Sequence, residues 1–374
     1  MKLYYLSGST IPSRTANSVH VMKMCQAFSE IGHDVTLFSR PGENPLEDCY
    51  AFYGVDRTFA IERIRCSRLA GWRALEYAWK IRKYVLSRSL PDLFYARHLF
   101  SLLCVANLGR PLIYEAHALP ENPIKRLAEL RLFLHPNFDR LVVISESLRR
   151  DYLDLFPILR SEKIVVAHDG ASIPDDNMAE SSDLPGRPGH PQVGYVGHLY
   201  PGRGIDLIQM LAARLTQVDF HIVGGTEEDL RYWRNRSRQP NLIFHGYVPH
   251  GRLGTYMHQF DIVLAPYQRR VALSGGKGDT SRWMSPMKIF EYMSYGKPII
   301  ASDLPVLREV LDHGRNAILV DPEDVASWEQ SIRDLATNKE LAEKIGKQAL
   351  LDIREKYSWT RRACRVLSGR SDYK

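Results

Sequence analysis

Short apolar runs alternate with longer amphipathic stretches along this chain, and this alternation limits the fold more than any other feature of the sequence. Residues 3–8 (LYYLSG) have the pattern of a strand that runs into a glycine-containing loop, residues 18–32 that of a helix stopped by Gly32, and residues 34–39 (DVTLFS) that of the next strand. Strands connected through helices in this way favour a parallel sheet that is covered on both faces. The sequence therefore predicts an α/β protein.

The alternation occurs in two blocks, which residues 174–191 separate. This segment has no periodicity and concentrates Pro, Gly, Ser and acidic residues, as interdomain linkers do. A chain of 374 residues is long enough for two domains with separate cores. We predict an N-terminal domain at 1–173, a C-terminal domain at 192–355, and a helical end at 356–374 that returns to the first domain. The remaining strands are predicted at 92–97, 111–117, 140–145 and 163–170 in the first block, and at 192–197, 219–225, 241–248, 261–267, 297–302 and 317–322 in the second.

Several classes of protein are disfavoured by what the sequence lacks. The five cysteines are scattered, odd in number and without a CxxC pair, so neither a disulfide framework nor a zinc site is indicated. The N-terminus turns polar at Ser7 before a signal-peptide hydrophobic region could form, and no apolar run reaches the roughly 18 residues of a membrane span. No GxGxxG follows the first strand, which disfavours a dinucleotide oxidoreductase. We expect a cytoplasmic protein, soluble or peripheral on the inner face of a membrane.

The positive charge is concentrated in one segment. Residues 57–90 hold nine Lys or Arg against two Glu, an excess of seven that equals the formal net charge of the whole chain. Aromatic and aliphatic residues are interleaved with these charges. Two interpretations stay open: an amphipathic helix on an anionic membrane surface, and a solvated helix that packs its aromatic side on its own core. Nucleic acid is disfavoured as a partner, because no known binding motif accompanies the charge.

A helix with clear end signals is predicted at 285–295 (SPMKIFEYMSY). Ser285 is a good N-cap and Pro286 suits the first helical position, while Gly296 suits a left-handed C-terminal cap and Pro298 prevents continuation. The N-terminus of this helix would present unpaired N–H groups and the positive end of a dipole, which together suit a phosphate.

Two charged residues share one face of this helix. Lys288 lies in the first turn, and Glu291 follows three residues later. The helix thus offers a phosphate-binding end and, about one turn deeper, a carboxylate that can accept hydrogen bonds from paired hydroxyls. A ribose diphosphate has that arrangement of groups. The alternative is that Glu291 is a solvated helix residue and Lys288 its partner.

Over most of the chain the sequence resembles the retaining GT-B glycosyltransferases of group 1, also called glycosyltransferase family 4. The resemblance implies two Rossmann-like parallel-sheet domains facing each other across a cleft, the first for the acceptor and the second for a nucleotide sugar. It agrees with the expectation that open parallel sheets bind ligands at the carboxyl ends of their strands. The segments that carry the resemblance, in family order, are 7–39, 114–121, 142–153, 162–172, 194–208, 244–267 and 285–311.

The resemblance implies transfer of a sugar from a nucleotide-diphosphate sugar, with UDP or GDP as the nucleotide, and with retention of the anomeric configuration. The acceptor is expected to be a glycan, either lipid-linked or a precursor of a cell-surface polysaccharide or glycolipid. Catalysis would lie mainly in stabilising the charge of the departing diphosphate. No Asp-x-Asp pair occurs in the sequence, so positive side chains are expected in place of a metal. No cofactor is expected, because the nucleotide sugar is a substrate.

The site residues of the family carry over onto this sequence in three groups. Glu291 would bind the ribose hydroxyls, Arg203 stands at the phosphate-binding lysine position, and Tyr247 and Val248 would border the base. The expected catalytic residues are His117, Arg203 and Lys288; the expected donor-binding residues are Gly197, His198, Tyr247, Val248, Ser285, Pro286, Met287 and Glu291; the expected acceptor-binding residues are Ser18, Arg97 and Glu115.

Three positions depart from the family pattern. Trp283 stands eight residues before Glu291, where the family often has a second acid; His198 replaces the usual arginine; and residues 16–18 (ANS) replace paired glycines. The first two departures motivate one alternative, a non-catalytic relative that still binds a sugar nucleotide. A sugar-nucleotide epimerase or hydrolase is another alternative, because the GT-B architecture also supports those reactions.

Overall fold

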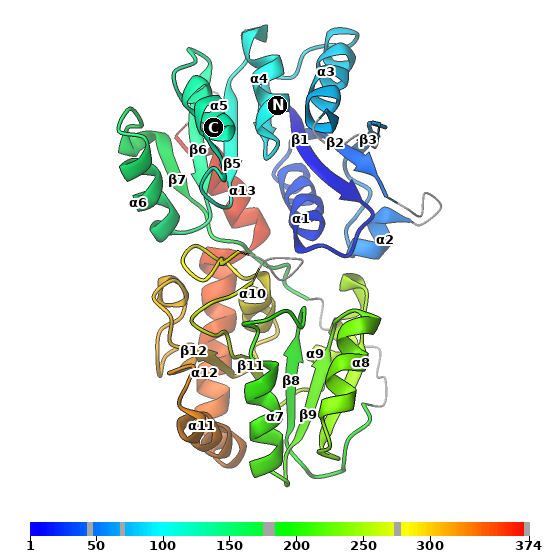
Figure 1. The fold of residues 1–374 in the computed structure, drawn as a ribbon, viewed down its shortest axis with the longest axis vertical. Coiled ribbons are helices and arrows are strands. Elements are labelled where there is room, and N and C mark those ends of the chain that lie inside the picture. Colours follow the sequence, from blue (N-terminus) through cyan, green and yellow to red (C-terminus); the bar gives the residue numbers. More distant parts are fainter. Residues whose placement is uncertain (43–47, 68–71, 175–183, 273–277, 370–374) are drawn as a thin grey trace. The chain divides into compact units, whose positions relative to one another are not determined.

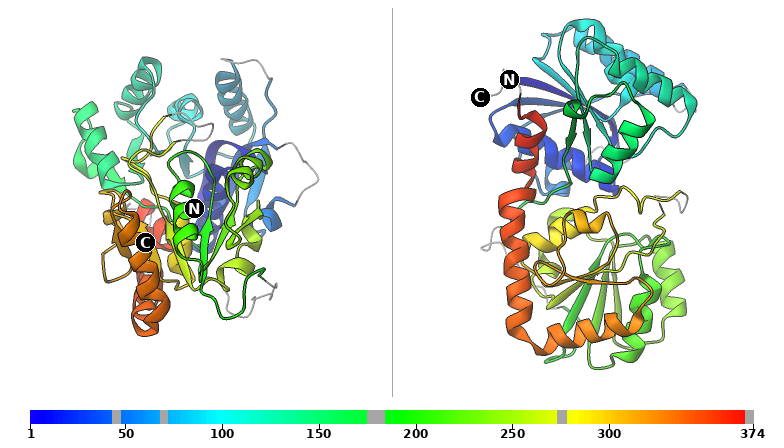
Figure 2. Two further views of the ribbon diagram at one scale, coloured as in Figure 1. Left: turned by 60° about the horizontal axis from the view of Figure 1, so that its bottom comes forward. Right: turned by 90° about the vertical axis from the view of Figure 1, so that its left-hand side faces the viewer.

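The computed structural model describes residues 1–42, 48–67, 72–174, 184–272 and 278–369. The chain divides into two units, Met1–His168 with Trp359–Lys374, and Asp169–Ser358. Each unit is a parallel sheet with helices on both faces, as Figure 1 and Figure 2 show. The predicted α/β class with two Rossmann-like sheets is confirmed. The predicted domain limits at 173 and 356 stay predictions, and half of the predicted linker lies outside the described residues.

The first unit contains a seven-stranded sheet in the order β3-β2-β1-β4-β5-β6-β7. All of its strand pairs are parallel, and each strand predicted in this half of the sequence is present. The strands are β1 (Lys2–Ile11), β2 (Asp34–Pro41), β3 (Ala60–Arg63), β4 (Leu93–Ala96), β5 (Leu112–Ala116), β6 (Phe138–Val143) and β7 (Ile164–Val166). The helices are α1 (Ala16–Glu30), α2 (Cys49–Tyr53), α3 (Arg73–Leu86), α4 (Leu99–Val105), α5 (Pro123–Phe133), α6 (Glu146–Leu155) and α13 (Trp359–Leu367).

The second unit contains a six-stranded sheet in the order β10-β9-β8-β11-β12-β13, again with parallel pairs. The strands are β8 (Gln192–Val196), β9 (Asp219–Val223), β10 (Leu242–Gly246), β11 (Ile262–Ala265), β12 (Ile299–Ser302) and β13 (Ile318–Val320). The helices are α7 (Ile205–Arg214), α8 (Glu227–Arg236), α9 (Gly254–Met257), α10 (Met287–Ser294), α11 (Val325–Thr337) and α12 (Lys339–Asp352), with a short 3-10 turn η4 (His250–Arg252) before α9.

The basic segment 57–90 is not a single helix. The strand β3 occupies its start, and α3 covers only Arg73–Leu86. The helix turns Tyr77, Ile81 and Val85 into the core of its own unit, as the second interpretation required, and it leaves other large apolar side chains exposed. No helix in the described part of the chain is long and apolar enough to cross a membrane.

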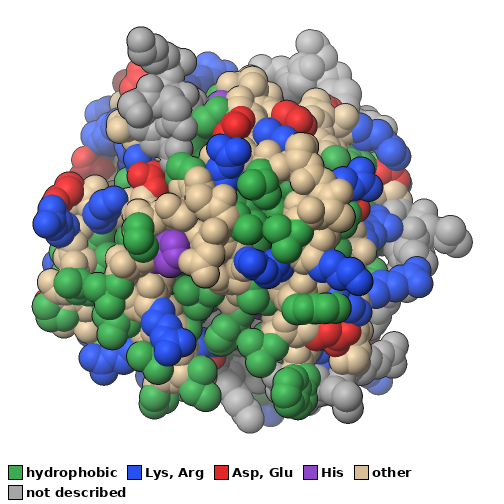
Figure 3. Space-filling view, turned by 90° about the horizontal axis from the view of Figure 1, so that it is seen from above, with side chains coloured by type: hydrophobic (Ala, Val, Ile, Leu, Met, Phe, Trp, Pro, Cys, Tyr) green, Lys and Arg blue, Asp and Glu red, His purple; other side chains and the backbone are tan. Residues whose placement is uncertain are grey.

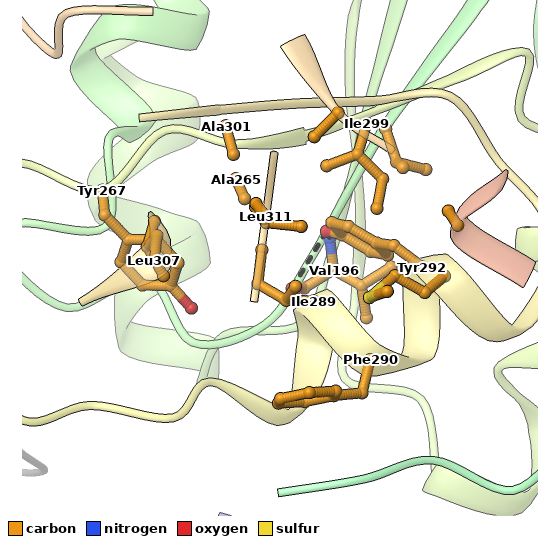
Figure 4. Close-up of a cluster of buried hydrophobic side chains, with 14 of the residues drawn as sticks. Val196, Ala265, Tyr267, Ile289, Phe290, Tyr292, Ile299, Ala301, Leu307 and Leu311 are labelled. Atoms are coloured by element: carbon orange, nitrogen blue, oxygen red, sulfur yellow. Dashed lines mark hydrogen bonds between the residues drawn. The ribbon is translucent and has the colours of Figure 1, made fainter. Parts of the chain in front are cut away.

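The helix α10 belongs to a hydrophobic cluster in the second unit, which Figure 4 shows in close-up. Its residues Ile289 and Phe290 are buried in one cluster with side chains of β8, β11 and β12. The Tyr292 hydroxyl accepts a hydrogen bond from the Val196 N–H at 2.8 Å and donates one to the Leu264 carbonyl at 3.2 Å. These bonds fasten α10 across β8 and β11, so the side chains on its other face are held at a fixed place on the sheet.

The start of α10 differs from the prediction, whereas its end agrees with it. The helix covers Met287–Ser294, and Pro286 precedes its first residue without a side-chain cap. The Ser285 hydroxyl accepts the N–H of Asp169 at 2.7 Å. The prediction of Ser285 as the N-cap is wrong, because its hydroxyl is hydrogen-bonded to the backbone of Asp169, which is distant in the sequence. At the other end Gly296 has a φ of 60°, the left-handed conformation that was expected there.

Candidate functional site

A candidate site lies where the strand connections of the second sheet reverse, between β8 and β11. Ligands of open α/β sheets bind at such points, outside the carboxyl ends of the strands. Gly197 follows β8 and has a φ of 146°, and a Cβ atom at this position would lie 2.9 Å from Nζ of Lys288. Glycine here leaves space in front of the lysine, whose helix is fastened across the same two strands.

Two cations meet at this point on a platform of tyrosine rings. Nζ of Lys288 lies 3.8 Å from the centre of the Tyr195 ring and 5.1 Å from that of Tyr267, and the guanidinium carbon of Arg203 lies 5.3 Å from the Tyr267 ring centre. Neither the buried Lys288 Nζ nor the buried Arg203 Nε has a hydrogen-bond partner within the described ranges. The predicted alternative of a Lys288–Glu291 ion pair is therefore wrong, although both residues share a helix face.

Burial and repulsion from Arg203 lower the pKa of Lys288 well below its usual value, and Glu291 acts in the opposite direction. The faces of Tyr195 and Tyr267 attract the charged form of the lysine but do not replace a hydrogen-bonded anion. A buried charge without such a partner is costly, and an anion that enters the site removes part of this cost. The arrangement is therefore suited to bind an anionic group of high charge.

His198, at the position where the family resemblance implies arginine, lies beside these cations. Its ring stacks on Tyr200 with centres 4.8 Å apart and an angle of 7° between the planes. Burial, together with the charges of Arg203 and Lys288, lowers the pKa of His198 to about 4. The ring is thus neutral near pH 7, and without a bound anion it adds no charge to the site.

Glu291 is paired with a histidine that the sequence analysis did not identify. Nε2 of His250 lies 2.6 Å from Oε1 of Glu291, and the two side chains are 22% and 17% exposed. His250 begins η4, immediately after the stretch that contains Tyr247 and Val248. The only feature of the sequence that pointed to His250 was its place in the loop expected to border the base. Its contact with Glu291 could not be predicted, because the two residues lie on separate elements.

The other predicted donor-binding residues lie on these same two segments. Tyr247 and Val248 are half-buried between β10 and η4, and Val248 packs against the hydrophobic cluster that holds α10. Ser285 is buried with its hydroxyl on the Asp169 backbone, while Pro286 and Met287 are half-buried at the N-terminus of α10. Their binding roles stay predictions.

In the first unit a buried carboxylate, Glu115 at the end of β5, organises a second cluster. Its Oε1 atom lies 2.8 Å from Nη2 of Arg362 on α13, 2.6 Å from Nε2 of His117 and 3.1 Å from Nε2 of His20. The Tyr95 hydroxyl donates to its other oxygen. Burial alone would raise the pKa of Glu115, but Arg362, His20 and His117 hold it well below its usual value. Glu115 is thus an ionised group that fixes its neighbours.

The predicted active-site histidine His117 is one of these neighbours. Burial and the charge of Arg97 lower its pKa to about 4, against the opposite effect of Glu115, so its ring is neutral near pH 7. Its Nε2–H donates to Glu115, and a quarter of its side chain is exposed. Arg97 donates to Nδ1 of His20 at 3.0 Å, which directs the other ring nitrogen of His20 to Glu115.

Two of the predicted acceptor-binding residues are completely enclosed. Glu115 is held as described, and the Ser18 hydroxyl lies 2.7 Å from the Thr15 carbonyl oxygen and 2.9 Å from that of Ser13, at the start of α1. Arg97 is half-buried. Contact of these three residues with an acceptor stays a prediction.

His20, Glu115 and His117 are the cluster among the described residues whose atoms lie close enough together to share a metal ion. The Arg362 guanidinium already donates to the same carboxylate oxygen that both histidines face. A metal ion at this oxygen would have to displace a buried guanidinium, so the cluster fits an ion-pair network better than a metal site.

Two family models match the chain. Residues 18–173 match the model of Glycosyltransferase Family 4, and residues 190–338 match that of Glycosyl transferases group 1. The two matches are consecutive and together span most of the sequence. The chain belongs to the group 1 glycosyltransferases of family 4. Its first match covers the segment with His117, and its second covers Arg203, Lys288 and Glu291.

Solved structures confirm the GT-B fold of this chain. HepE of Anabaena, solved in complex with UDP, superimposes with a TM-score of 0.70 at 17% sequence identity, over 98% of both chains. Among curated relatives, the D-inositol 3-phosphate glycosyltransferase of Nocardia farcinica is 22% identical over 68% of this chain and 59% of its own length. An uncharacterized glycosyltransferase of Methanocaldococcus jannaschii is 21% identical over 78% of this chain and 79% of its own. The chain spans a third or less of the length of three other curated relatives, between 24% and 32%.

Proposed function

We propose that this glycosyltransferase takes its sugar from a nucleotide-diphosphate sugar and transfers it with retention of the anomeric configuration. The observation that carries the proposal is the buried ammonium of Lys288, which has no hydrogen-bond partner in the described part of the chain and lies beside Arg203. Both cations lie at the carboxyl end of the second sheet, and Lys288 is in the first turn of α10. A diphosphate supplies the anionic charge that this pair lacks, and the helix N-terminus adds favourable dipoles.

The chemistry follows from where the charge develops. When the bond between the sugar and the diphosphate breaks, negative charge grows on the departing diphosphate, and preformed cations stabilise it. Arg203 and Lys288 supply the positive charge that stabilises the diphosphate. Because both lie in a partly buried place, their attraction for the diphosphate is stronger than it would be in water. We propose that no metal ion is needed for this step. Glu291, about one turn deeper on α10, accepts hydrogen bonds from the ribose hydroxyls.

In the first unit we propose that His117 lies beside the transferred sugar. Glu115 fixes the orientation of its ring, and the low pKa keeps the ring neutral, so it acts as a hydrogen-bonding group and not as a cation. Arg97, which is partly exposed, is the charged residue of this cluster best placed for an acceptor.

Calorimetry combined with a donor-consumption assay tests this function. The first donor to try is UDP-glucose, because the structurally similar HepE was solved with UDP and with UDP-glucose; GDP sugars follow in the same screen. A transferase should bind UDP and slowly release sugar from the donor even without acceptor, and NMR should show the released sugar first in the anomeric form of the donor. Binding without any consumption would instead establish a non-catalytic relative, and conversion into an epimer would establish an epimerase.

We further propose that the acceptor is a lipid-linked glycan and that the first unit binds an anionic membrane surface through α3. Trp72, just before the helix, is 70% exposed, and Leu75 and Trp79 on the helix are 49% and 58% exposed. Their spacing of three and four residues places them on one side of the helix. An interfacial helix combines this kind of apolar side with basic residues.

A basic groove adjoins this apolar side. It has a volume of about 490 Å³, and its lining includes the cationic side chains of Arg63, Arg65, Lys80 and Lys83. Nζ of Lys83 also lies 5.6 Å from the Trp79 ring centre, so the charged and apolar groups are contiguous. Figure 3 shows a face of the molecule on which Lys and Arg side chains alternate with hydrophobic ones. Anionic phospholipid headgroups complement this charge.

Sedimentation with vesicles tests the membrane proposal. The protein should sediment at low salt with vesicles of phosphatidylglycerol and phosphatidylcholine, and should not sediment with phosphatidylcholine alone. The double variant Trp72→Ala/Trp79→Ala should lose this binding, whereas Ile124→Ala/Leu127→Ala, which removes two exposed apolar side chains from α5, should keep it. Equal losses in both variants, or no sedimentation of the wild type, would contradict the proposal.

A further inference from the structure

We infer that His250 is a positioning residue for nucleotide binding, which holds the Glu291 carboxylate in the orientation that receives the ribose and keeps it away from Lys288. The inference rests on the proposed function, since it takes Glu291 as the ligand of the ribose hydroxyls. It concerns a residue that acts through another, because the contact of His250 is with Glu291.

The position of His250 is fixed by packing on both sides of η4. Val248 precedes it and Leu253 follows it, and both side chains pack against the hydrophobic cluster that also contains the buried face of α10. The loop is tied internally as well, because the Leu253 N–H donates to the His250 carbonyl at 3.2 Å. A Cβ atom at Gly254 would lie 3.0 Å from the Tyr295 hydroxyl, so the segment also approaches the end of α10 closely. The distance between the histidine and the helix is thus set by other contacts.

The hydrogen bond with His250 is compatible with a role of Glu291 as a ligand. At 2.6 Å, Nε2–H of His250 donates to Oε1 of Glu291. A carboxylate offers about four lone-pair positions on two oxygens, so it can accept this bond and also bonds from hydroxyl donors. A charge-assisted bond of this kind restricts the rotation of the carboxylate, and the restriction is made before the nucleotide arrives.

The same bond explains why Lys288 stays unpaired. Lysine and glutamate three residues apart on one helix face attract each other, and an ion pair between them is the arrangement normally expected. In this chain Lys288 Nζ has no hydrogen-bond partner in the described ranges, and the glutamate is paired with His250 instead. Without His250, rotation of Glu291 toward Lys288 would neutralise the cation that the diphosphate needs. One histidine thus preserves two separate binding groups.

Titration calorimetry with two nucleotides tests this role. UDP has both ribose hydroxyls, and 2′,3′-dideoxy-UDP lacks them. For UDP, His250→Ala should weaken binding about tenfold or more, since the bond it removes is to a charged group. For the dideoxy nucleotide the loss should be smaller, because only the effect on Lys288 remains. His250→Gln, whose amide N–H can still donate to the carboxylate, should recover most of the UDP affinity.

A double-mutant cycle with Glu291→Ala separates this inference from the proposed function. If Glu291→Ala binds UDP as the wild type does, the ribose-binding role of Glu291 in the proposed function is wrong. If Glu291→Ala weakens binding, His250→Ala should cause little further loss in that background, because both changes remove the same interaction. Full additivity, or equal losses for the two nucleotides, would overturn the inference. His258→Ala, which removes another half-buried histidine of this segment, should leave both affinities near those of the wild type.

Discussion

The Lys288 ammonium lies 3.8 Å from the centre of the Tyr195 ring, and it has no hydrogen-bond acceptor in the described ranges. A buried ammonium without a hydrogen-bond acceptor lowers the stability of the unliganded protein. The same ammonium strengthens the binding of an anionic ligand. Lys288→Met, which has a similar length and no charge, should therefore increase the free energy of unfolding by about 1 kcal/mol or more. The same variant should bind UDP at least about tenfold more weakly, since it loses a charge-assisted contact.

Urea unfolding and calorimetry measure these two effects. Lys347→Met is the matched control, because Lys347 is an exposed residue of α12 whose partner is Glu343 at i−4. The control should change stability by a few tenths of a kcal/mol at most and leave UDP binding unchanged. A Lys288→Met protein that is less stable than the wild type and still binds UDP normally would show that Lys288 is a structural residue.

The affinity for UDP should depend on pH through the same lysine. Burial and Arg203 lower the pKa of Lys288 below its ordinary value of 10.5, so the unfolded chain binds more protons than the folded one between the lowered pKa and 10.5. The contribution of Lys288 to the free energy of unfolding therefore rises with pH between the lowered pKa and 10.5. A bound diphosphate, in contrast, favours the protonated form of Lys288. We expect UDP binding to take up a proton and to weaken as the pH rises into the window.

Calorimetry of UDP binding in buffers of different ionisation enthalpy measures this proton uptake. The apparent binding enthalpy should vary with the buffer in the wild type at a pH above the lowered pKa. In Lys288→Met the dependence of the apparent binding enthalpy on the buffer should be smaller, because the protons that Lys288 takes up on UDP binding are no longer counted. An unchanged number of protons in the variant would assign the uptake to another group.

Most of the fold follows from local patterns, whereas one strand does not. The predicted strands are apolar runs bounded by Gly, Pro or polar residues, and each of them is present. β3 (Ala60–Arg63) was not predicted, because it is short, polar and at the edge of its sheet, with no buried side chain. Backbone hydrogen bonds pair this strand with β2, and its side chains do not show the alternating apolar pattern that would have predicted a strand.

The candidate site was predictable only where its residues are close together in the sequence. Lys288 and Glu291 share a short motif, and the family resemblance added Arg203. Tyr195 and His250 were missed, because their contacts with α10 join elements far apart in the chain. Their residue types have no special spacing, and the tertiary fold alone brings them to the helix. The same reason explains Ser285, whose hydroxyl is taken by the distant Asp169 backbone.

The ion pair between Glu115 and Arg362 should be important for the stability of the first unit. Both side chains are almost completely buried, and the guanidinium on α13 lies 2.8 Å from the carboxylate at the end of β5. Arg362→Met leaves a buried carboxylate with only histidine and tyrosine partners, and should cost about 3–5 kcal/mol in urea unfolding. Arg361→Met, at the exposed neighbouring position, should have a much smaller effect. Glu115→Gln/Arg362→Met should recover part of the loss; a double variant as unstable as the sum of both single variants would contradict the pairing.

His198 stands at a position where the family resemblance implies arginine, and the variant His198→Arg tests the effect of that difference on nucleotide binding. Since burial and the two neighbouring cations lower the pKa of His198 to about 4, the ring is neutral at pH 7. Arginine would add a permanent third cation beside Arg203 and Lys288. His198→Arg should therefore bind UDP severalfold more tightly, with a steeper dependence on salt, and should be about 1–2 kcal/mol less stable without ligand.

The control for this prediction is His198→Gln, which keeps a neutral hydrogen-bonding side chain and should bind UDP about as well as the wild type at pH 7. The sign of the pH effect provides a second check. Because the folded-state pKa of His198 is lowered, the unfolded chain binds more protons between about pH 4 and pH 6.5, and the contribution of His198 to stability rises with pH across that range. This slope should be reduced in the glutamine variant. If UDP binding weakens more steeply between pH 6 and pH 8 in the wild type than in His198→Gln, the histidine is protonated in the complex, and it then supplies the charge of the missing arginine.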